Sequence, residues 1–149
     1  MENLKNLNFY KCEICGNISY KVCDSGNSLS CCGRVMTPMM SESTDGDPEV
    51  HVPVCVCKGT TVCVTVGAKD HPMTEGHHIE FISIITDRGV YMKTMAHAGH
   101  PSTCFEISDG EKVLLVKAFC NLHGMFEAEC NCIGCCDSKS DNNCKDNEK

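Results

Sequence analysis

Four cysteines near the start of the chain have the spacing of a metal site. Cys12 and Cys15 form a C-x-x-C hook whose short loop can direct both sulfurs at one ion, and the adjacent pair Cys31 and Cys32 can complete a tetrahedron. Because adjacent residues do not easily point at the same ion, we expect a local backbone twist and a distorted geometry. The spacing does not choose between iron and zinc. A closed set of four thiolates leaves no position for a substrate, so such a site can support folding or, with iron, transfer electrons.

Four further segments place imidazole or thiol groups where they could bind a second metal ion. Their candidate ligands are His51, His71, His77, Cys120 and His123. In a straight strand His71 and His77 would lie ~20 Å apart, so the chain between them must fold back if they are to share an ion. Pro72 and Gly76 suit such a turn. Any one of these histidines alone is more simply an ordinary surface residue, but the four contexts together favour a second site.

The composition favours metal or redox chemistry. The chain has 149 residues, 15 of them cysteine, and a formal net charge of -7. This acidic balance argues against nucleic acid as a partner, and an anionic substrate would need local positive charge. The first residues lack the pattern of a secretory signal, and no apolar stretch is long enough to cross a bilayer. We therefore expect a cytoplasmic protein whose cysteines serve metal or redox chemistry rather than a disulfide framework.

The composition also divides the chain into four parts. Residues 1–40 hold two cysteine pairs in a segment too short to bury much surface without a metal. Residues 41–48 are polar and rich in turn-forming residues, as in a linker. Residues 49–129 have the pattern of a β domain. Residues 130–149 form a cysteine-rich polar tail that cannot build a core, so we expect it to be disordered unless something holds it.

Alternating apolar residues predict an all-β, antiparallel sandwich for residues 49–129. Valines share one face of a predicted strand at Val50–Cys57, and a Lys-Gly-Thr turn separates it from a second alternating run, Thr61–Val66. Further strands are predicted at Ile79–Thr86, Val90–Met95, Cys104–Ile107 and Lys112–Phe119. Many short strands separated by regular turns are typical of a sandwich. No long amphipathic helix is predicted.

Taken in order, these motifs resemble those of desulfoferrodoxin, the two-iron class of superoxide reductase. The motifs are Cys12-x-x-Cys15 with Cys31-Cys32, Glu-x-His-Val-Pro, His-Pro-Met-x-x-x-His and Cys-Asn-x-His-Gly, and they span residues 9–129. Each motif alone is only suggestive, whereas four in the same order are specific. The resemblance implies a small desulforedoxin-like N-terminal domain, residues 1–40, followed by an immunoglobulin-like β-sandwich, residues 49–129.

The resemblance also implies two mononuclear non-haem irons. The first would bind to Cys12, Cys15, Cys31 and Cys32. The second would have His51, His71, His77 and His123 as equatorial ligands and Cys120 as the axial thiolate. The implied activity is one-electron reduction of superoxide to hydrogen peroxide at the open sixth position, with electrons from a rubredoxin-like donor, in a homodimer. His78, His97 and His100 fall outside the motifs.

Glu49 and its neighbour Val50 mark where this sequence agrees with the family and where it departs. The resemblance implies that Glu49 takes the sixth position after oxidation. Val50 stands where the family usually has a lysine that is thought to attract superoxide. Lys69 or Lys58 could supply the missing charge, although each is more simply a surface lysine. We expect a slower and less salt-sensitive reaction than in relatives with the lysine.

Most of the cysteines lie outside these two ligand sets. Cys55, Cys57 and Cys63 most simply serve as small apolar residues of strands, while Cys23 and Cys104 carry no pattern. The tail cysteines are Cys130, Cys132, Cys135, Cys136 and Cys144. They could wrap a third metal ion, form disulfides in a redox tail, or belong to a disordered appendage without function. We favour the absence of fixed structure and leave their function open.

Two other classes of function compete with an enzyme. One is a non-catalytic iron electron carrier whose histidine site is closed or unloaded. The other is a metal-binding or storage protein, which the cysteine-rich tail favours. The two complete sets of ligand motifs favour the enzyme. The sequence names neither the physiological donor nor the role of the first iron, which either transfers electrons or only supports folding.

Overall fold

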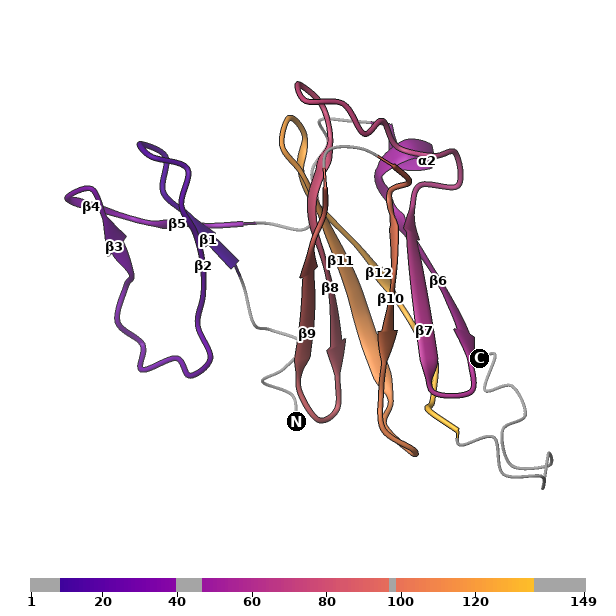
Figure 1. The fold of residues 1–149 in the computed structure, drawn as a ribbon. Helices are drawn as coiled ribbons and strands as arrows, with labels where there is room; N and C mark the ends of the chain where they lie inside the picture. Colours follow the sequence, from indigo (N-terminus) through magenta and orange to yellow (C-terminus); the bar gives the residue numbers. More distant parts are fainter. Residues whose placement is uncertain (1–8, 40–46, 97–98, 136–149) are drawn as a thin grey trace. The chain divides into compact units, whose positions relative to one another are not determined.

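The computed structural model describes residues 9–39, 47–96 and 99–135. The chain divides into two compact units, Met1–Met40 and Ser41–Lys149, and each is described by itself (Figure 1). Among the described residues, no helix has the length and apolar character needed to span a membrane.

The first unit consists of short strands around very little apolar material. Its strands are β1 Phe9–Lys11, β2 Ile18–Tyr20, β3 Ser30–Cys31, β4 Arg34–Val35 and β5 Thr37–Pro38. β1 pairs with β2 and β5 in a small antiparallel sheet, while β3 and β4 pair separately. The buried apolar side chains of its described part are Phe9, Cys12, Met36 and Met39. So small a core gives this unit little stability of its own, and a metal site can then contribute much of the folding free energy.

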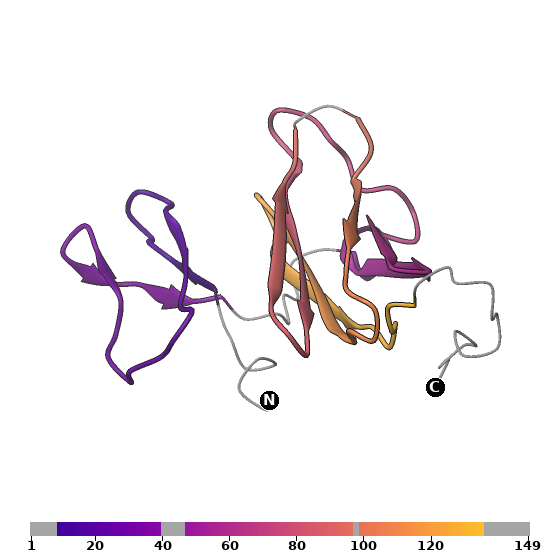
Figure 2. The same cartoon turned by 60° about the horizontal axis from the view of Figure 1, so that its bottom comes forward.

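The second unit is a sandwich of two antiparallel sheets (Figure 2). Its strands are β6 Pro53–Lys58, β7 Thr61–Val66, β8 Ile79–Thr86, β9 Val90–Thr94, β10 Ser102–Glu106, β11 Val113–Cys120 and β12 Gly124–Glu129. One sheet has the order β10-β7-β6 and the other the order β12-β11-β8-β9. The predicted all-β sandwich is therefore confirmed, and a division into three and four strands is that of a constant-type immunoglobulin sandwich.

The core lies between the two sheets, where side-chain alternation directs the apolar residues. In β7, Val62, Val64 and Val66 are buried while the residues between them are partly exposed. β8 and β11 add further buried residues, among them Ile82 and Val116. Because the chain has no Trp and few aromatic residues, β-branched side chains supply most of this packing. The result is a rigid platform for the segments that join its strands.

The chain departs from the predicted strand just before β6. Pro48–His51 forms one helical turn, α2. The carboxylate of Asp47 accepts a hydrogen bond from the backbone N–H of Glu49 at 2.9 Å, and a proline in the first turn loses no helical hydrogen bond. The valines at every second position are therefore misleading here, and Asp47 and Pro48 begin α2 rather than end a linker. The rest of the predicted linker, residues 41–46, lies outside the described residues.

The other predicted strands agree closely with the observed ones. β7 and β8 have the predicted bounds, and β9, β10 and β11 begin and end within two residues of theirs. β12 has no separate prediction, because its residues GMFEAE do not alternate between apolar and polar.

The segment after β12 is held against the sandwich. Cys130 is buried, and its N–H donates to the carbonyl of Leu114 at 3.2 Å. The N–H of Val113 in turn donates to the carbonyl of Cys132 at 2.8 Å. The expectation of a disordered tail therefore does not hold for residues 130–135, because main-chain hydrogen bonds extend the pairing along β11. Residues 136–149 lie outside the described residues.

Several cysteines of the second unit form disulfides. The pairs are Cys55–Cys130, Cys57–Cys132 and Cys63–Cys104. The interpretation of Cys55, Cys57 and Cys63 as small apolar residues alone is therefore wrong. Cys63 and Cys104 occupy directly opposed positions on β7 and β10, with Cα atoms 4.0 Å apart. Such pairings depend on which strands become neighbours, which the cysteine spacing does not reveal.

One carboxylate is buried inside the sandwich. Glu111 accepts hydrogen bonds from the hydroxyl groups of Thr86 and Tyr91 and from the backbone N–H of Ser108. Burial alone would raise the pKa of Glu111, but these hydrogen bonds outweigh it and hold the pKa below the ordinary 4.5. A charged Glu111 therefore stabilises the loops that join β8 to β9 and β10 to β11.

We predict that Glu111→Gln lowers the free energy of unfolding at neutral pH by about 1–3 kcal/mol, because an amide replaces a charged acceptor of several hydrogen bonds. The pKa of Glu111 is lower in the folded protein than in the unfolded chain. The stabilisation by the charged carboxylate is therefore complete above the pKa of the unfolded chain and is lost as the pH falls through the pKa of the folded protein. Denaturant unfolding of the wild type and Glu111→Gln, from neutral pH down to below the folded-state pKa of Glu111, measures the difference in the free energy of unfolding. Glu106→Gln, which alters an exposed carboxylate bonded to Thr60 and Thr61, is the matched control and should stay within about 0.5 kcal/mol. An equal effect of both variants would contradict the prediction.

Candidate metal centres

Imidazole and thiol groups from separate segments converge in the second unit. His51 ends α2, His71 and His77 lie between β7 and β8, and Cys120 ends β11. One ligand atom from each of these four residues lies within 4.8 Å of the others. His123, between β11 and β12, places Nδ1 2.9 Å from Nε2 of His51 and 3.6 Å from Sγ of Cys120. The structure thus brings together all five predicted ligands of the second metal, here called the histidine–cysteine site.

Main-chain carbonyls orient two of the imidazoles. Nδ1 of His51 donates to the carbonyl of Asp47 at 2.8 Å, and Nδ1 of His71 donates to that of Pro72 at 2.7 Å. A carbonyl only accepts, so in each ring the proton lies on Nδ1 and the lone pair on Nε2. Phe126 also stacks on His51, with ring centroids 4.7 Å apart. Partners of this kind fix the ring orientation of histidines that bind metals.

Two imidazole nitrogens point into the site without a partner. Nε2 of His71 and Nε2 of His77 are buried and have no hydrogen-bond partner among the described residues. A buried polar atom left in this state costs about 1–3 kcal/mol. A metal ion removes the cost by accepting both lone pairs, and imidazole nitrogens with one thiolate suit a transition metal. The residues present therefore fit a metal at this position.

Burial keeps these histidines neutral. It lowers the pKa of His71 to about 4, even though the hydrogen bond to the Pro72 carbonyl acts in the opposite direction. Burial also lowers the pKa of His77, and charge repulsion from His123 and His51 adds to the effect. Neutral imidazole is the form that binds metals, so no proton needs to leave these two rings at neutral pH.

Gly67 lets the loop that carries His71 lie against α2. It has a φ of +89°, and a Cβ added there would overlap the carbonyl oxygens of Lys69 and Val50. Only glycine avoids both the backbone strain and the overlap. The close approach sets His71 beside His51, with ring centroids 4.6 Å apart.

Asn121 connects the two loops that supply the other ligands. Its side-chain oxygen accepts from the N–H of His78 at 2.9 Å, and its amide donates to the carbonyl of Gly76 at 3.0 Å. These bonds hold His77 close to the turn that follows Cys120. No role is predicted for Asn121 from the sequence, although its place within the Cys-Asn-x-His-Gly motif is a signal that could have revealed one.

Glu49 lies two residues before His51 on α2 and has an exposed carboxylate. Its Oε2 is 2.9 Å from Nζ of Lys69, which is also exposed. Such a pair contributes little to stability because water screens it. Both charges are therefore available to a solute that approaches the site.

The histidines outside the motifs have other partners. His78 is buried, and its ring nitrogens bond to the carbonyl of Thr74 at 2.8 Å and to the carboxylate of Glu80 at 2.9 Å. Nδ1 of the exposed His100 lies 3.7 Å from the carboxylate of Asp70. His97 lies outside the described residues. His78 is thus committed to local structure despite its position next to His77.

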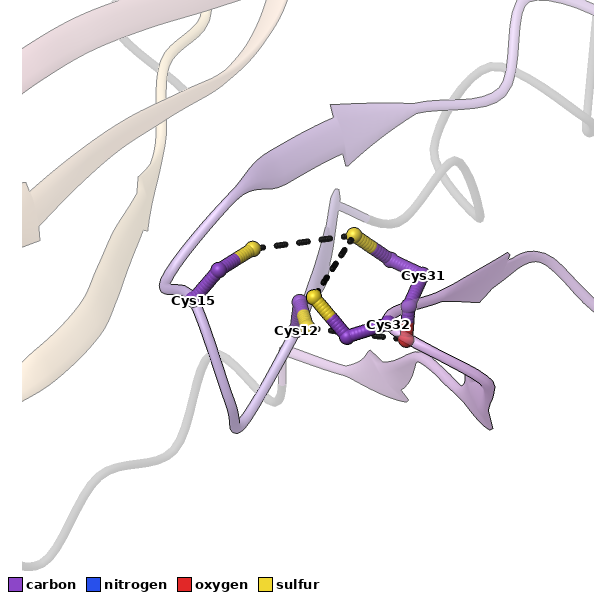
Figure 3. Close-up of side chains that lie close together, drawn as sticks. All are labelled: Cys12, Cys15, Cys31 and Cys32. Carbon is purple, nitrogen blue, oxygen red and sulfur yellow. Dashed lines mark hydrogen bonds between the residues drawn. The ribbon is translucent and has the colours of Figure 1, made fainter.

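The four-cysteine site lies in the first unit (Figure 3). The Sγ atoms of Cys12, Cys15, Cys31 and Cys32 all lie within 4.8 Å of one another. Cys15 and Cys31 have their sulfurs 3.6 Å apart, and Cys31 and Cys32 have theirs 4.0 Å apart. With metal–sulfur bonds of about 2.3 Å, the sulfurs of a regular tetrahedron are about 3.8 Å apart. The adjacent pair has the expected twist, because Cys32 has a left-handed φ of 54°.

The four thiols do not all ionise readily unless a cation joins them. Backbone N–H groups of Cys15 and Ile14 lower the pKa of Cys12 to about 6. Hydrogen bonding with the sulfurs of Cys15 and Cys12 favours the protonated thiol of Cys32 and raises its pKa to about 12, and repulsion by a charged Cys12 adds a smaller effect. A metal ion bound to the four sulfurs would stabilise every thiolate and so overcome the resistance of Cys32 to ionisation. The residues present fit a closed tetrathiolate metal site.

Comparisons with known proteins agree with these two sites. The desulfoferrodoxin family matches residues 42–129, and its N-terminal domain family matches residues 5–39. A desulfoferrodoxin from Nitratidesulfovibrio vulgaris is 40% identical over 120 residues, covering 80% of this chain and 94% of the relative. A desulfoferrodoxin homolog from Archaeoglobus fulgidus is 38% identical over 119 residues, with the same two coverages of 80% and 94%. A superoxide reductase structure from Treponema pallidum matches with a TM-score of 0.71 and 29% identity over 83% of this chain and 97% of its own.

We predict that Gly67→Ala removes about one metal equivalent per chain, because the added methyl group forces the His71 loop away from α2. The four-cysteine site, in the other unit, should keep its metal. Elemental analysis of the purified protein measures the loss, and circular dichroism tests whether the sandwich persists. Gly89→Ala is the matched control, since a Cβ there meets nothing within 4 Å. Full metal content in both variants would show that the close approach is not needed.

Proposed function

This chain belongs to the desulfoferrodoxin family, and from this premise we propose that it is a superoxide reductase. Superoxide would take up one electron and two protons and leave as hydrogen peroxide. The observation that carries the proposal is a convergence of ligand atoms from His51, His71, His77, Cys120 and His123. In it, Nε2 of His71 and of His77 are buried and have no partner within the described part of the chain. The similarity to a superoxide reductase structure supports the same activity.

Iron is the metal that we assign to both sites. Imidazole with thiolate and four thiolates are both donor sets that iron accepts. Bound at the histidine–cysteine site, iron would supply a one-electron reductant with a coordination position that no protein ligand fills. Cys12, Cys15, Cys31 and Cys32 would hold the other iron. Cys120, His51, His71, His77 and His123 would hold the iron at the histidine–cysteine site, as the family resemblance implies.

The protein's own contribution is to hold the ligands and to place charge. The carbonyls of Asp47 and Pro72 keep the Nε2 lone pairs of His51 and His71 directed at the metal position. Cys120 is 0% exposed, so water does not screen the negative charge of its thiolate. A thiolate ligand increases electron density at iron and so favours electron donation to a bound oxygen species.

Glu49 and Lys69 are the charged side chains that we assign to the approach of superoxide. Val50 is half-buried and offers no charge where the family usually has a lysine. Lys58 lies at the far end of β6, roughly 17 Å along the strand from the end nearest α2. Lys69, paired with Glu49, is therefore the better candidate for attracting an anion, while Glu49 reduces its effect. The family resemblance implies that Glu49 would be a further residue to hold the iron in its oxidised form.

The four-cysteine site fits an accessory role in this proposal. It has no open position, so it would either stabilise the first unit or pass on electrons from a rubredoxin-like donor. That unit exposes Ile14, Val22 and Val35, which supports a homodimer in which a second copy covers them. A cytoplasmic location belongs to the same proposal, because free thiolates persist where cysteines are kept reduced.

The reaction is tested by metal analysis together with product stoichiometry. We expect two irons per chain, and hydrogen peroxide formed without release of O2 as superoxide is consumed. His71→Ala should lower the rate by at least about 100-fold by removing a ligand. His100→Ala, which removes an exposed imidazole outside the ligand set, should leave the rate unchanged. Release of O2 would indicate dismutation instead. Zinc in place of iron at the histidine–cysteine site would leave a structural or metal-storage protein.

We predict that Val50→Lys raises the second-order rate with superoxide by up to about tenfold at low ionic strength, because it adds positive charge beside the site. Lys69→Met should lower that rate and flatten its dependence on salt. Pulse radiolysis at several ionic strengths measures both. Lys58→Met removes the same charge at the far end of β6 and serves as control. If Val50→Lys alters neither the rate nor its salt dependence, electrostatic attraction at this position has no part in the reaction.

A further inference from the structure

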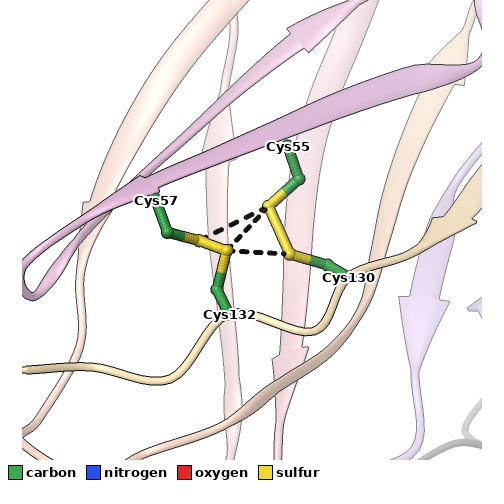
Figure 4. Close-up of a disulfide and its surroundings, with 4 residues drawn as sticks. All are labelled: Cys55, Cys57, Cys130 and Cys132. Carbon is green, nitrogen blue, oxygen red and sulfur yellow. Dashed lines mark hydrogen bonds between the residues drawn. A yellow bond between two sulfur atoms is a disulfide. The ribbon is translucent and has the colours of Figure 1, made fainter. Parts of the chain in front are cut away.

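A third group of sulfurs joins the two sheets of the sandwich, apart from both sites already described (Figure 4). It consists of Cys55 and Cys57 on β6 and Cys130 and Cys132 just after β12, and is called here the inter-sheet cysteine cluster. β6 and β12 are edge strands of opposite sheets. The four Sγ atoms all lie within 4.8 Å of one another. We propose that this cluster, in its reduced form, binds one zinc ion through four thiolates, and that the two disulfides are its oxidised, metal-free form.

The arrangement of the cluster suits a single ion. Residues two apart on a strand point to the same face, so Cys55 and Cys57 on β6 present both sulfurs together. The sulfurs of Cys130 and Cys132, which follow β12, also lie close together, 3.4 Å apart. Cys55 and Cys57 point inward, whereas Val54 and Val56 on the other face of β6 are 44% and 64% exposed. The two hooks therefore face each other across the gap between the sheets.

The spacing of the sulfurs agrees with a tetrahedral thiolate site. Sγ of Cys55 lies 4.0 Å from that of Cys57 and 3.9 Å from that of Cys132, and the sulfurs of Cys130 and Cys132 are 3.4 Å apart. A tetrahedron with metal–sulfur bonds of about 2.3 Å needs separations of about 3.8 Å. The two bonded pairs, Cys55–Cys130 and Cys57–Cys132, must separate from disulfide contact to a similar distance when they are reduced.

Main-chain hydrogen bonds hold the second hook without help from sulfur. Besides the bonds of Cys130 to Leu114 and of Val113 to Cys132, the N–H of Gly134 donates to the carbonyl of Glu111 at 2.8 Å. A Cβ on Gly134 would overlap the carbonyl oxygen of Ser108, so the segment lies tightly against the loop before β11. Reduction of the disulfides would therefore leave the sulfurs close together, as a preorganised metal site requires.

The surroundings of the cluster favour a metal over free thiolates. Cys130 belongs to the buried core, and Cys55, Cys57 and Cys132 pack against it. Unpaired thiolates in such a place would be costly, whereas a divalent ion compensates their charge. A closed set of four thiolates is typical of structural zinc.

The reduced and oxidised forms differ by four electrons. Each disulfide forms when two thiolates lose two electrons, and one hydrogen peroxide takes up those electrons with two protons to give two waters. Two peroxides thus convert the zinc-bound cluster to two disulfides and release Zn²⁺. Only the source of the peroxide rests on the proposed function, and the test uses added reagent.

The test uses the full chain, reduced without oxygen and then exposed to Zn²⁺. The wild type should retain about one zinc per chain more than Cys57→Ser/Cys132→Ser, which removes one sulfur from each hook. Cys63→Ser/Cys104→Ser, which removes the disulfide between β7 and β10, is the matched control and should retain the extra ion. Added hydrogen peroxide should release it with formation of two disulfides.

A second measurement needs no variant. Alkylation of the reduced wild type, mapped by mass spectrometry, should show zinc-dependent protection of Cys55, Cys57, Cys130 and Cys132, while the exposed Cys23 reacts in either condition. Equal alkylation with and without zinc, or no zinc beyond that of Cys57→Ser/Cys132→Ser, would leave the cluster as a pair of disulfides and overturn the proposal. Superoxide reduction is measured separately, so its failure would not alter this result.

Discussion

The meeting of imidazole and thiolate ligands from distant parts of the chain is the constraint around which the loops of the second unit are arranged. His51 and His123 are 72 residues apart in sequence, yet their ring nitrogens are 2.9 Å apart. Contacts of such long range form only when both sheets are in place. Because the metal binds the folded arrangement alone, its binding free energy adds to the stability of the sandwich. Without it, the unpartnered nitrogens of His71 and His77 oppose that stability.

A helix cap, a glycine and hydrogen bonds to main-chain groups, more than side-chain packing, set the positions of the ligands. α2 begins at the Asp47 cap and presents His51 at its end, and Gly67 allows the next loop to approach it closely. Asn121 then joins that same loop, through its main-chain groups, to the turn between β11 and β12. Each of these features fixes the main chain next to a ligand rather than the side chain of the ligand itself. The metal site can therefore be rigid although its residues lie at the ends of strands and in the connections between them.

The sequence predicted the ligand sets better than the surrounding structure. Metal ligands follow from local motifs, and alternating residues define strands such as β7 and β8. The same alternation predicted a strand before β6, but the N-cap Asp47 and Pro48 in the first turn favour the helical turn α2 there. Gly67 acts through a close approach to Val50, which no local pattern reveals. Asn121 lies within a recognisable motif, but its partners in the β7–β8 loop do not follow from that motif. The partners of Cys55 and Cys57 were hidden for the same reason, because they depend on which sheet edges meet.

The four-cysteine site and the inter-sheet cysteine cluster have the same ligand type, four thiolates, but differ in how far the surrounding fold depends on the metal. In the first unit, Cys12 and Cys15 with Cys31 and Cys32 are brought together by short loops and a strained residue, around a core of very few apolar side chains. There the ion must help to create the fold. In the second unit, two of the cysteines lie on β6 and two just after β12, and a large core already holds these segments in place. A sandwich that persists without metal can tolerate the exchange of thiolates for disulfides, whereas the first unit, with so little else to stabilise it, would lose its fold along with its ion.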